Sequence, residues 1–246
     1  MPDTLHRPPA LATPLITQVV GSRVVVYETI DSTNDRALRL GGDGTVIVAD
    51  TQTAGRGRHG RSWHSSPGRG LYFSVAFEGA ADGLAFAAPL AVRDAIAPFA
   101  PATVKWPNDV LIGGKKVCGV LVETRLGRAA VGIGINVLHT AEEFPEALRH
   151  RATSIEAATG VTCDRSQLLR DVLTRLDERV IVIRSGGLDA VFAEWAEACG
   201  IVGRRVRNGE VEGTVVRLDP DGALVLDCSG ESHRVLLGDI IELEGA

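Results

Sequence analysis

The segment QTAGRGRHGRSW occupies residues 52–63. Three glycines and three arginines fall within its seven positions 55–61. Glycine lets the backbone approach a ligand closely, and the planar guanidinium group of arginine presents paired donors that match a phosphate or carboxylate group. This composition is typical of a loop that closes over a small anion, and a solvated surface loop is the plainer alternative.

The flanks of this loop decide between two kinds of fold. Gly55, Gly57 and Gly60 match the pattern G-x-G-x-x-G, which in a dinucleotide-binding fold directly follows a strand and opens a helix. Here the strand predicted at 45–50 ends several residues before the loop, and a second strand-like segment, 71–78, follows it. The loop therefore connects two strands, and the sequence does not predict a Rossmann fold.

The composition argues against several classes of protein. The chain has 246 residues, of which 45% are hydrophobic, enough for one large domain or for one domain with a small appendage. Its net charge of −5 argues against a dedicated nucleic-acid binder, so we expect no DNA partner. The arginines of the loop then form a local positive patch, which suits a small anionic ligand better than a polymer.

The cysteines and the N-terminal segment indicate a cytoplasmic protein. The four cysteines are scattered without a C-x-x-C pair, which predicts reduced thiols rather than a zinc site or a disulfide framework. Residues 1–14 have no apolar core run, so we expect neither a signal peptide nor a membrane anchor. No stretch approaches the length of a transmembrane helix, and we expect no membrane partner.

Hydrophobic periodicity predicts strands and helices up to residue 200 and only short strands after it. The predicted strands of the first part are 23–27, 45–50, 71–77, 103–106, 110–112, 116–124 and 129–137, and its predicted helices are 37–40, 84–97, 166–183 and 188–198. The later strands are 204–206, 212–218, 223–227 and 233–237, with Asn-Gly and Asp-Gly turn signals between them. We therefore expect two domains, 1–200 and 201–246, the second a small barrel.

Two polar segments are candidates for ligand binding. Ser32, Thr33 and Asn34 are preferred helix N-cap types, and the same donors could instead meet a ligand at the helix N-terminus. The segment KWPND at 105–109 reads equally well as a hairpin turn with a packed tryptophan. Its functional alternative is a magnesium–phosphate centre, since amide and carboxylate oxygens suit that ion.

Two strand segments contain unusual glycines. In 114–123, GKKVCGVLVE, lysines precede a very apolar strand, which is typical either of a solvated hairpin tip or of a site beside the strand. This segment is not a P-loop, because Asp109 stands where that motif requires glycine. In 132–136, GIGIN, two glycines leave room for a ligand or for a closely packed helix.

Together these segments resemble the biotin protein ligases. Residues 55–61 match G-R-G-R-x-G-R, residues 105–109 match K-W-P-N-D, and residues 116–123 match K-x-x-G-[I/V]-L-x-E, each completely. The resemblance is strong over about residues 23–137. It implies an α+β fold in which helices flank a central mixed or antiparallel sheet, as in class II synthetases, with a small C-terminal SH3-like β-barrel.

The resemblance also implies a two-step reaction. The carboxylate of biotin attacks the α-phosphate of ATP, with Mg²⁺, to give biotinyl-5′-AMP and pyrophosphate. A lysine of a biotin carboxyl carrier protein or domain then attacks the anhydride and releases AMP. Longer members carry an N-terminal DNA-binding domain, for which Ser32 lies too near the start, so we expect the short, non-repressor class. A lipoate ligase and a non-catalytic DNA-binding biotin sensor are the alternatives, and the sequence leaves a homodimer open.

Roles follow by matched position. The residues matched to biotin binding are Ser32, Thr33, Asn34, Gln52, Arg56, Gly57, Arg58, Lys116, Gly119, Leu121, Gly132 and Gly134. Those matched to ATP and the adenylate are Arg56, Arg58, Arg61, Trp63, Asn108, Lys116 and Asn136. The expected catalytic residues are Lys116, Arg58 and Asp109. Lys116 bridges the carboxylate and α-phosphate, whereas Asp109 contacts magnesium through the phosphates and helps to deprotonate or orient the incoming lysine.

Overall fold

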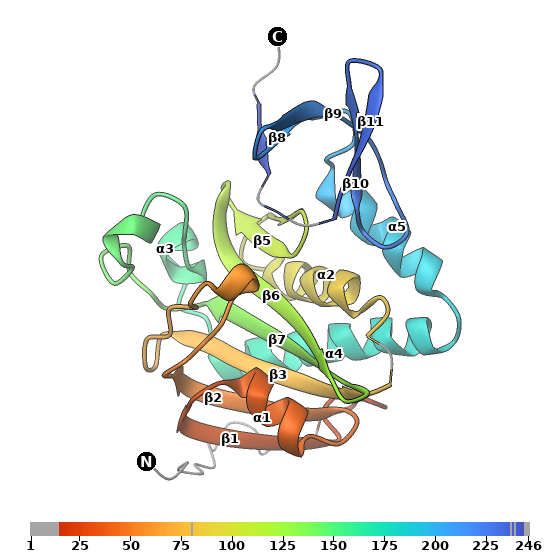
Figure 1. The fold of residues 1–246 in the computed structure, drawn as a ribbon. Helices are drawn as coiled ribbons and strands as arrows, with labels where there is room; N and C mark the ends of the chain where they lie inside the picture. The colour runs from red at the N-terminus through yellow and green to blue at the C-terminus, as the bar shows by residue number, and fades with distance from the viewer. Residues whose placement is uncertain (1–14, 80, 237, 239, 244–246) are drawn as a thin grey trace.

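The computed structural model describes residues 15–79, 81–236, 238 and 240–243 (Figure 1). The N-terminal segment 1–14, where no signal peptide or membrane anchor is expected, lies outside these residues. The main part of the chain is a seven-stranded sheet with α1 on one face and the longer helices on the other, and a smaller sheet stands at one end (Figure 1).

The large sheet is mixed, as the resemblance implies. Its strand order is β1-β2-β3-β7-β6-β5-β4. Only β1 and β2 run parallel, and every other neighbouring pair is antiparallel. The strands are β1 (Arg23–Ile30), β2 (Thr45–Gln52), β3 (Gly70–Glu78), β4 (Ala102–Lys105), β5 (Asp109–Ile112), β6 (Lys115–Arg125) and β7 (Arg128–Asn136).

The helices agree with the predicted ones except at one end and in one omission. They are α1 (Thr33–Leu40), α2 (Leu84–Ile96), α3 (Ile155–Thr159), α4 (Arg165–Arg184) and α5 (Leu188–Cys199), with 3-10 turns η2 (Arg58–Gly60) and η3 (Glu146–Leu148). The apolar pattern covers only 37–40 of helix α1, which begins at Thr33 because Ser32, one of the expected N-cap residues, caps it and accepts a hydrogen bond from the Asp35 N–H. The short α3 has no predicted counterpart.

Side chains that point alternately to the two faces of the large sheet form two separate apolar cores. On one face, a large apolar core packs under α2 and α4 and includes Val46, Val48, Val131 and Ile133. On the other face, a small cluster under α1 consists of Tyr27, Ile30, Ala37, Ile47, Ala49, Ala76 and Ala130. Successive residues of a strand point to opposite faces, so this second face is left largely to small and polar side chains.

The C-terminal part is a five-stranded antiparallel sheet in the order β11-β10-β9-β8-β12. Its strands are β8 (Arg205–Asn208), β9 (Val211–Leu218), β10 (Leu224–Cys228), β11 (Glu231–Val235) and β12 (Ile241–Glu242). The expected turn signal at 208–209 falls where β8 ends before β9, and that at 221–222 lies between β9 and β10, which confirms both signals. Among the described residues no pairing joins β11 to β12, so the SH3-like barrel stays a prediction.

The two sheets share one continuous core. Trp195 of α5 belongs to the same apolar cluster as Val206, Val215 and Leu224 of the smaller sheet. The expected division at residue 201 therefore stays a prediction. Within the described ranges, no helix is both long and apolar enough to cross a membrane, and all four cysteines are free, as expected.

Candidate active site

The α1 face of the large sheet carries two rows of candidate residues. Strand pairing places Ser74, Gly132 and Leu121 side by side across β3, β7 and β6. The next row contains Gly134, Gly119 and Asp109. Glycines thus occupy the middle of both rows, and the structure brings together residues that lie far apart in the sequence. We call Gly119, Gly132 and Gly134 the glycine floor.

The protein's own side chains lie directly on the glycine floor. A Cβ atom added to Gly132 would stand 2.4 Å from Oδ1 of Asn34, and one added to Gly134 would stand 2.5 Å from the indole of Trp63. At Gly119 the nearest atom would be 2.9 Å away, again on Trp63. No larger residue fits these positions without displacing a neighbour. The nearest groups here are Asn34 and Trp63, so the expected contact with the biotin ring stays a prediction.

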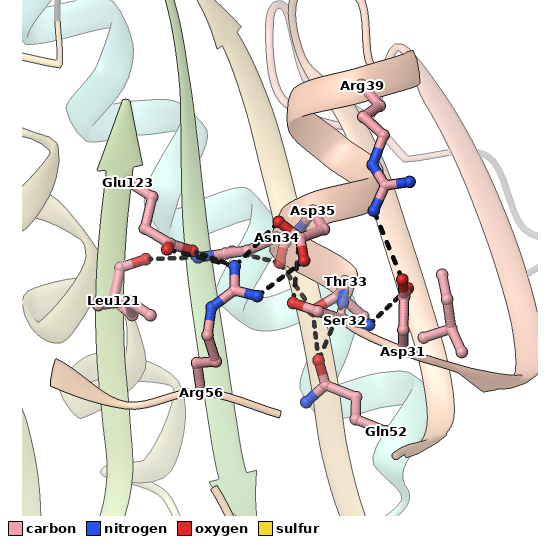
Figure 2. A network of polar contacts seen from close by, with 12 residues as sticks. Asp31, Ser32, Thr33, Asn34, Asp35, Arg39, Gln52, Arg56, Leu121 and Glu123 are labelled. Atoms are coloured by element: carbon pink, nitrogen blue, oxygen red, sulfur yellow. Dashed lines mark hydrogen bonds and ion pairs between the residues drawn. The ribbon is translucent and has the colours of Figure 1, made fainter. Parts of the chain in front are cut away.

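A polar cradle forms where α1 begins, beside the end of β2 (Figure 2). The N–H and hydroxyl of Thr33 donate to Oε1 of Gln52 at 2.9 and 3.0 Å. The Ser74 hydroxyl lies 2.8 Å from Oγ1 of Thr33 and 2.6 Å from Oδ1 of Asn34. Ser32, Thr33 and Asn34 are almost fully buried. Buried hydroxyl and amide groups need partners, so the cradle is a fixed set of donors and acceptors.

Arg56 ties the loop to α1 and β6 (Figure 2). Its Nη1 and Nη2 donate to the two carboxylate oxygens of Asp35 at 2.7 and 3.0 Å. Nη2 also donates to both oxygens of Glu123, at 3.2 and 3.1 Å, and Asn34 donates to Glu123 at 2.7 Å. The hydrogen bond from Arg56 lowers the pKa of Asp35. The terminal nitrogens of Arg56 therefore already hold two carboxylates, which a ligand anion would have to replace.

A cationic cluster lies on the other side of the glycine floor. The Nζ of Lys116 lies 2.6 Å from Oδ1 of Asp109 and 5.5 Å from the centre of the Trp63 ring system. Nη1 of Arg58 donates to Oδ1 of Asn108 at 3.3 Å, and the Asn108 side chain donates to the carbonyl of Val120. The expected catalytic residues Lys116, Arg58 and Asp109 are thus neighbours.

Comparisons with known proteins identify the family of this chain. Residues 26–139 match the biotin/lipoate A/B protein ligase family. A biotin–[acetyl-CoA-carboxylase] ligase of Mycobacterium tuberculosis is 34% identical over 217 residues, which cover 82% of this chain and 80% of that protein. The chain belongs to the biotin protein ligase family. The bifunctional ligase/repressor BirA of Bacillus subtilis is 32% identical over 246 residues, covering 92% of this chain and 76% of the relative.

A solved structure of the same family has the same fold. Biotin protein ligase from Aquifex aeolicus in complex with biotin and ATP superimposes with a TM-score of 0.78 at 33% identity. The match covers 91% of this chain and the whole of the Aquifex chain. The expected α+β architecture of a biotin protein ligase, a mixed sheet with helices and a C-terminal antiparallel sheet, is therefore confirmed.

Other matched positions stabilise the loop and the end of β7. Gly57 donates to the carbonyl of Arg61 at 2.7 Å, and Trp63 donates to the carbonyl of Gly55 at 2.9 Å, so the loop folds back on itself. Asn136 donates its amide to the carbonyl of Thr153 at 3.0 Å. In this structure Asn136 therefore holds a neighbouring backbone segment, and its expected contact with the nucleotide stays a prediction.

Sequence reasoning missed several residues of this ligase site. Asp35 and Glu123 pair with Arg56, and Ser74 completes the cradle; a lone serine in the apolar β3 was the one signal for it. A further buried polar pair was also not predicted: the Tyr72 hydroxyl accepts from the Ser66 N–H at 3.1 Å and lies 3.4 Å from Nε2 of His139. Burial raises the pKa of Tyr72 to about 12 and lowers the pKa of His139 to about 4.

Proposed function

We propose that the chain is an ATP-dependent biotin ligase. It activates biotin as biotinyl-5′-AMP and transfers the biotinyl group to a lysine of a biotin carboxyl carrier protein or domain. One observation carries this: a polar cradle and a cationic cluster face the same side of the sheet, on opposite sides of the glycine floor. That spacing suits a substrate with a polar ring at one end and a carboxylate at the other.

The cradle would recognise the polar ring of biotin. Thr33 presents a hydroxyl and a backbone N–H, and Gln52 an amide, and these groups are already held by mutual hydrogen bonds. A preorganised site loses less entropy when it binds. Gly132, Gly134 and Leu121 lie next to the cradle on the same face, where they would contact the less polar part of the molecule.

The cationic cluster would promote the attack of the carboxylate on the α-phosphate. Two anions must approach each other, and Lys116 and Arg58 would offset their repulsion and stabilise the charge that develops at phosphorus. A carboxylate oxygen forms the new bond to phosphorus as pyrophosphate leaves. The acceptor amine then attacks the acyl carbon, and AMP leaves with the bonding electrons.

Asp109 would act in the second step. In this structure its Oδ1 is engaged by Lys116 at 2.6 Å. When Lys116 turns toward the substrate phosphate, Asp109 becomes free to orient the incoming lysine and to accept its proton. Before substrate binds, the opposite charges of Lys116 and Asp109 offset each other in this ion pair.

Magnesium would enter with ATP. In the part of the chain that the structure describes, no group of three or more His, Cys, Asp or Glu side chains could hold a metal ion. Mg²⁺ at ATP sites usually needs only one or two protein oxygens in addition to phosphate and water. Asp109 and Asn108 lie beside Lys116 and Arg58, so their oxygens fit that limited role.

The chain's charge and cysteines support two further expectations. Four free cysteines fit the reducing cytoplasm. With a net charge of −5, the chain is expected not to bind duplex DNA. A titration with DNA at several salt concentrations would check this. Sedimentation of the purified protein with and without biotin and ATP would measure whether it forms a homodimer.

A transfer assay tests the function. The purified chain is incubated with Mg-ATP, labelled biotin and an apo carrier domain, and the acceptor is analysed by mass spectrometry. We expect one biotinyl group on the carrier lysine and none on a carrier in which that lysine is replaced by arginine. Because the family also includes lipoate ligases, a parallel arm contains lipoate. Transfer of lipoate without transfer of biotin would refute the proposal.

A further inference from the structure

A buried hydrogen bond joins the turn between β4 and β5 to the C-terminal sheet. Nε1 of Trp106 donates to the carbonyl oxygen of Gly222 at 2.8 Å, although the two residues are 116 positions apart. Trp106 is 2% exposed. Water cannot reach a buried donor, so separating the indole N–H from its acceptor would leave it without any hydrogen bond, at a cost in free energy. This contact therefore holds the two segments together.

The acceptor is held firmly by its own turn. Gly222 lies between β9 and β10 with a φ of +86°, in the left-handed region that favours glycine. Its N–H donates to the carbonyl of Asp219 at 2.8 Å, and Arg234 pairs with both Asp219 and Asp221. A Cβ atom added to Gly222 would stand 3.0 Å from the ring of Phe86 on α2. The turn therefore packs directly against the larger part of the molecule.

Trp106 is close in sequence to two polar residues of the site. Asn108 receives a hydrogen bond from Arg58 at 3.3 Å, and Asp109 pairs with Lys116 at 2.6 Å. Only Pro107 separates Trp106 from Asn108. A shift of the indole would therefore be passed to both polar side chains. Misplacement of a reacting group by about 1 Å can reduce a rate about a hundredfold.

We propose that Trp106 is a positioning residue for adenylate formation, through which the C-terminal sheet holds Asn108 and Asp109 against Arg58 and Lys116. This inference rests on the proposed ligase function. The cradle of Thr33 and Gln52 lies at the start of α1 and the end of β2, away from this turn. Trp106 is thus expected to affect the use of ATP and to leave the binding of biotin alone unchanged.

The chain offers a matched control for this proposal. Trp195 of α5 is also almost fully buried, at 1% exposed, and its ring centroid lies 4.6 Å from that of Phe86. Its Nε1 has no hydrogen-bond partner among the described residues. Trp106→Phe and Trp195→Phe both shrink a buried ring, but only Trp106→Phe removes a hydrogen bond to the C-terminal sheet.

The experiment measures three quantities for the full-length wild type and both variants. They are the biotin Kd without ATP, the single-turnover rate of pyrophosphate release and the KM for ATP. For Trp106→Phe we expect the rate to fall about threefold to tenfold, which is the range that a net hydrogen bond is worth. We expect a raised KM for ATP and a biotin Kd within about twofold of wild type. For Trp195→Phe all three values stay near those of the wild type.

A second variant alters the acceptor of the same hydrogen bond, the Gly222 carbonyl. In Gly222→Ala the added methyl group presses against Phe86 and displaces the carbonyl, while Trp106 stays intact. We expect the same result as for Trp106→Phe: slower pyrophosphate release and a raised KM for ATP, with an unchanged biotin Kd. The proposal is overturned if both variants release pyrophosphate at the wild-type rate, or if biotin affinity falls in proportion to that rate, or if Trp195→Phe is equally impaired. Failure of the wild type to release pyrophosphate in the presence of biotin would instead refute the proposed function.

Discussion

Two arginines two positions apart in one loop have different partners. Arg56 is held by the carboxylates of Asp35 and Glu123, whereas Arg58 donates to the neutral amide of Asn108. The pair of Arg56 with Asp35 is bidentate, which is the strong geometry for an arginine and a carboxylate, so Arg56 anchors the loop. A phosphate or carboxylate of a ligand would compete with the Asn108 amide for Arg58. We therefore predict that Arg56 attaches the loop and that Arg58 contacts the ligand.

Lys116→Ala should abolish most adenylate formation and leave the fold intact. The backbone of Lys116 bonds to Arg151 and Thr153, and alanine keeps both of these hydrogen bonds. Loss of one preorganised charge at a phosphoryl-transfer centre costs on the order of 3 kcal/mol, or about a hundredfold in rate. Pyrophosphate release measures this. Lys115→Ala, which removes the exposed neighbouring lysine, is the control and should behave as wild type.

Arg58→Gly should make the enzyme release its intermediate. It removes a charged donor and adds a fourth glycine to the short loop, which raises the entropy cost of closing it. A hydrogen bond to a charged group is worth about 1.5 to 3 kcal/mol, so escape of the adenylate should rise roughly tenfold to a hundredfold. Biotin incorporation into albumin measures the escape. Wild-type albumin labelling, with adenylate still being formed, would show that Arg58 does not retain the intermediate.

At the scale of elements, α1 and the glycine–arginine loop act as one unit. Asp35 in the first turn of α1 forms the bidentate pair with Arg56. The Ser32 hydroxyl caps the same helix. The cradle residues and the loop anchor therefore share a single helical turn, so movement of the loop would be felt at the cradle.

Asp35→Asn should loosen the loop without unfolding the protein. The substitution removes the negative charge from the bidentate pair while keeping the size of the side chain. We expect hydrogen exchange of residues 55–63 to speed up about threefold to tenfold, the range for a well-oriented, half-exposed ion pair. Asp31→Asn is the control, since its 3.5 Å pair with Arg39 is largely exposed. Equal exchange rates in the two variants would contradict the role given to Asp35.

The elements were largely predictable, and the contacts between them were not. The apolar segments predicted as strands located β2, β3, β6 and β7 to within a few residues. The N-cap residue types indicated where α1 begins, but the burial of Ser32, Thr33 and Asn34 was not predictable, because such polar residues are mostly exposed. The pairing of Arg56 with Glu123 depends on the register of β6 in the sheet. The link between Trp106 and Gly222 joins residues 116 positions apart, and no local pattern reports such a contact.

At the scale of the whole molecule, one buried histidine should make stability depend on pH. Burial lowers the pKa of His139 to about 4 in the folded state, whereas an unfolded histidine titrates near 6.5. Below about pH 6.5 the unfolded chain binds a proton that the folded chain excludes. The contribution is therefore fully present above about pH 6.5 and is lost progressively as the pH falls toward 4.

Denaturant unfolding at several pH values measures this contribution. The free energy of unfolding should fall by up to about 3 kcal/mol from His139 between pH 6.5 and pH 4. His139→Gln should flatten that part of the curve, while His233→Gln, which removes a half-exposed histidine of β11, should not. If His139→Gln and the wild type lose stability in parallel, His139 is not the cause.

The central claim is that one face of the sheet joins biotin to AMP before any acceptor is present. The most direct measurement is a single-turnover reaction with ATP labelled at the α-phosphate, biotin and the full-length chain, resolved by chromatography. We predict that biotinyl-5′-AMP accumulates on the enzyme, only when biotin is present, and is converted to AMP when an apo carrier domain is added. Transfer of biotin to the carrier without a labelled adenylate, or release of ADP in place of AMP, would contradict the account.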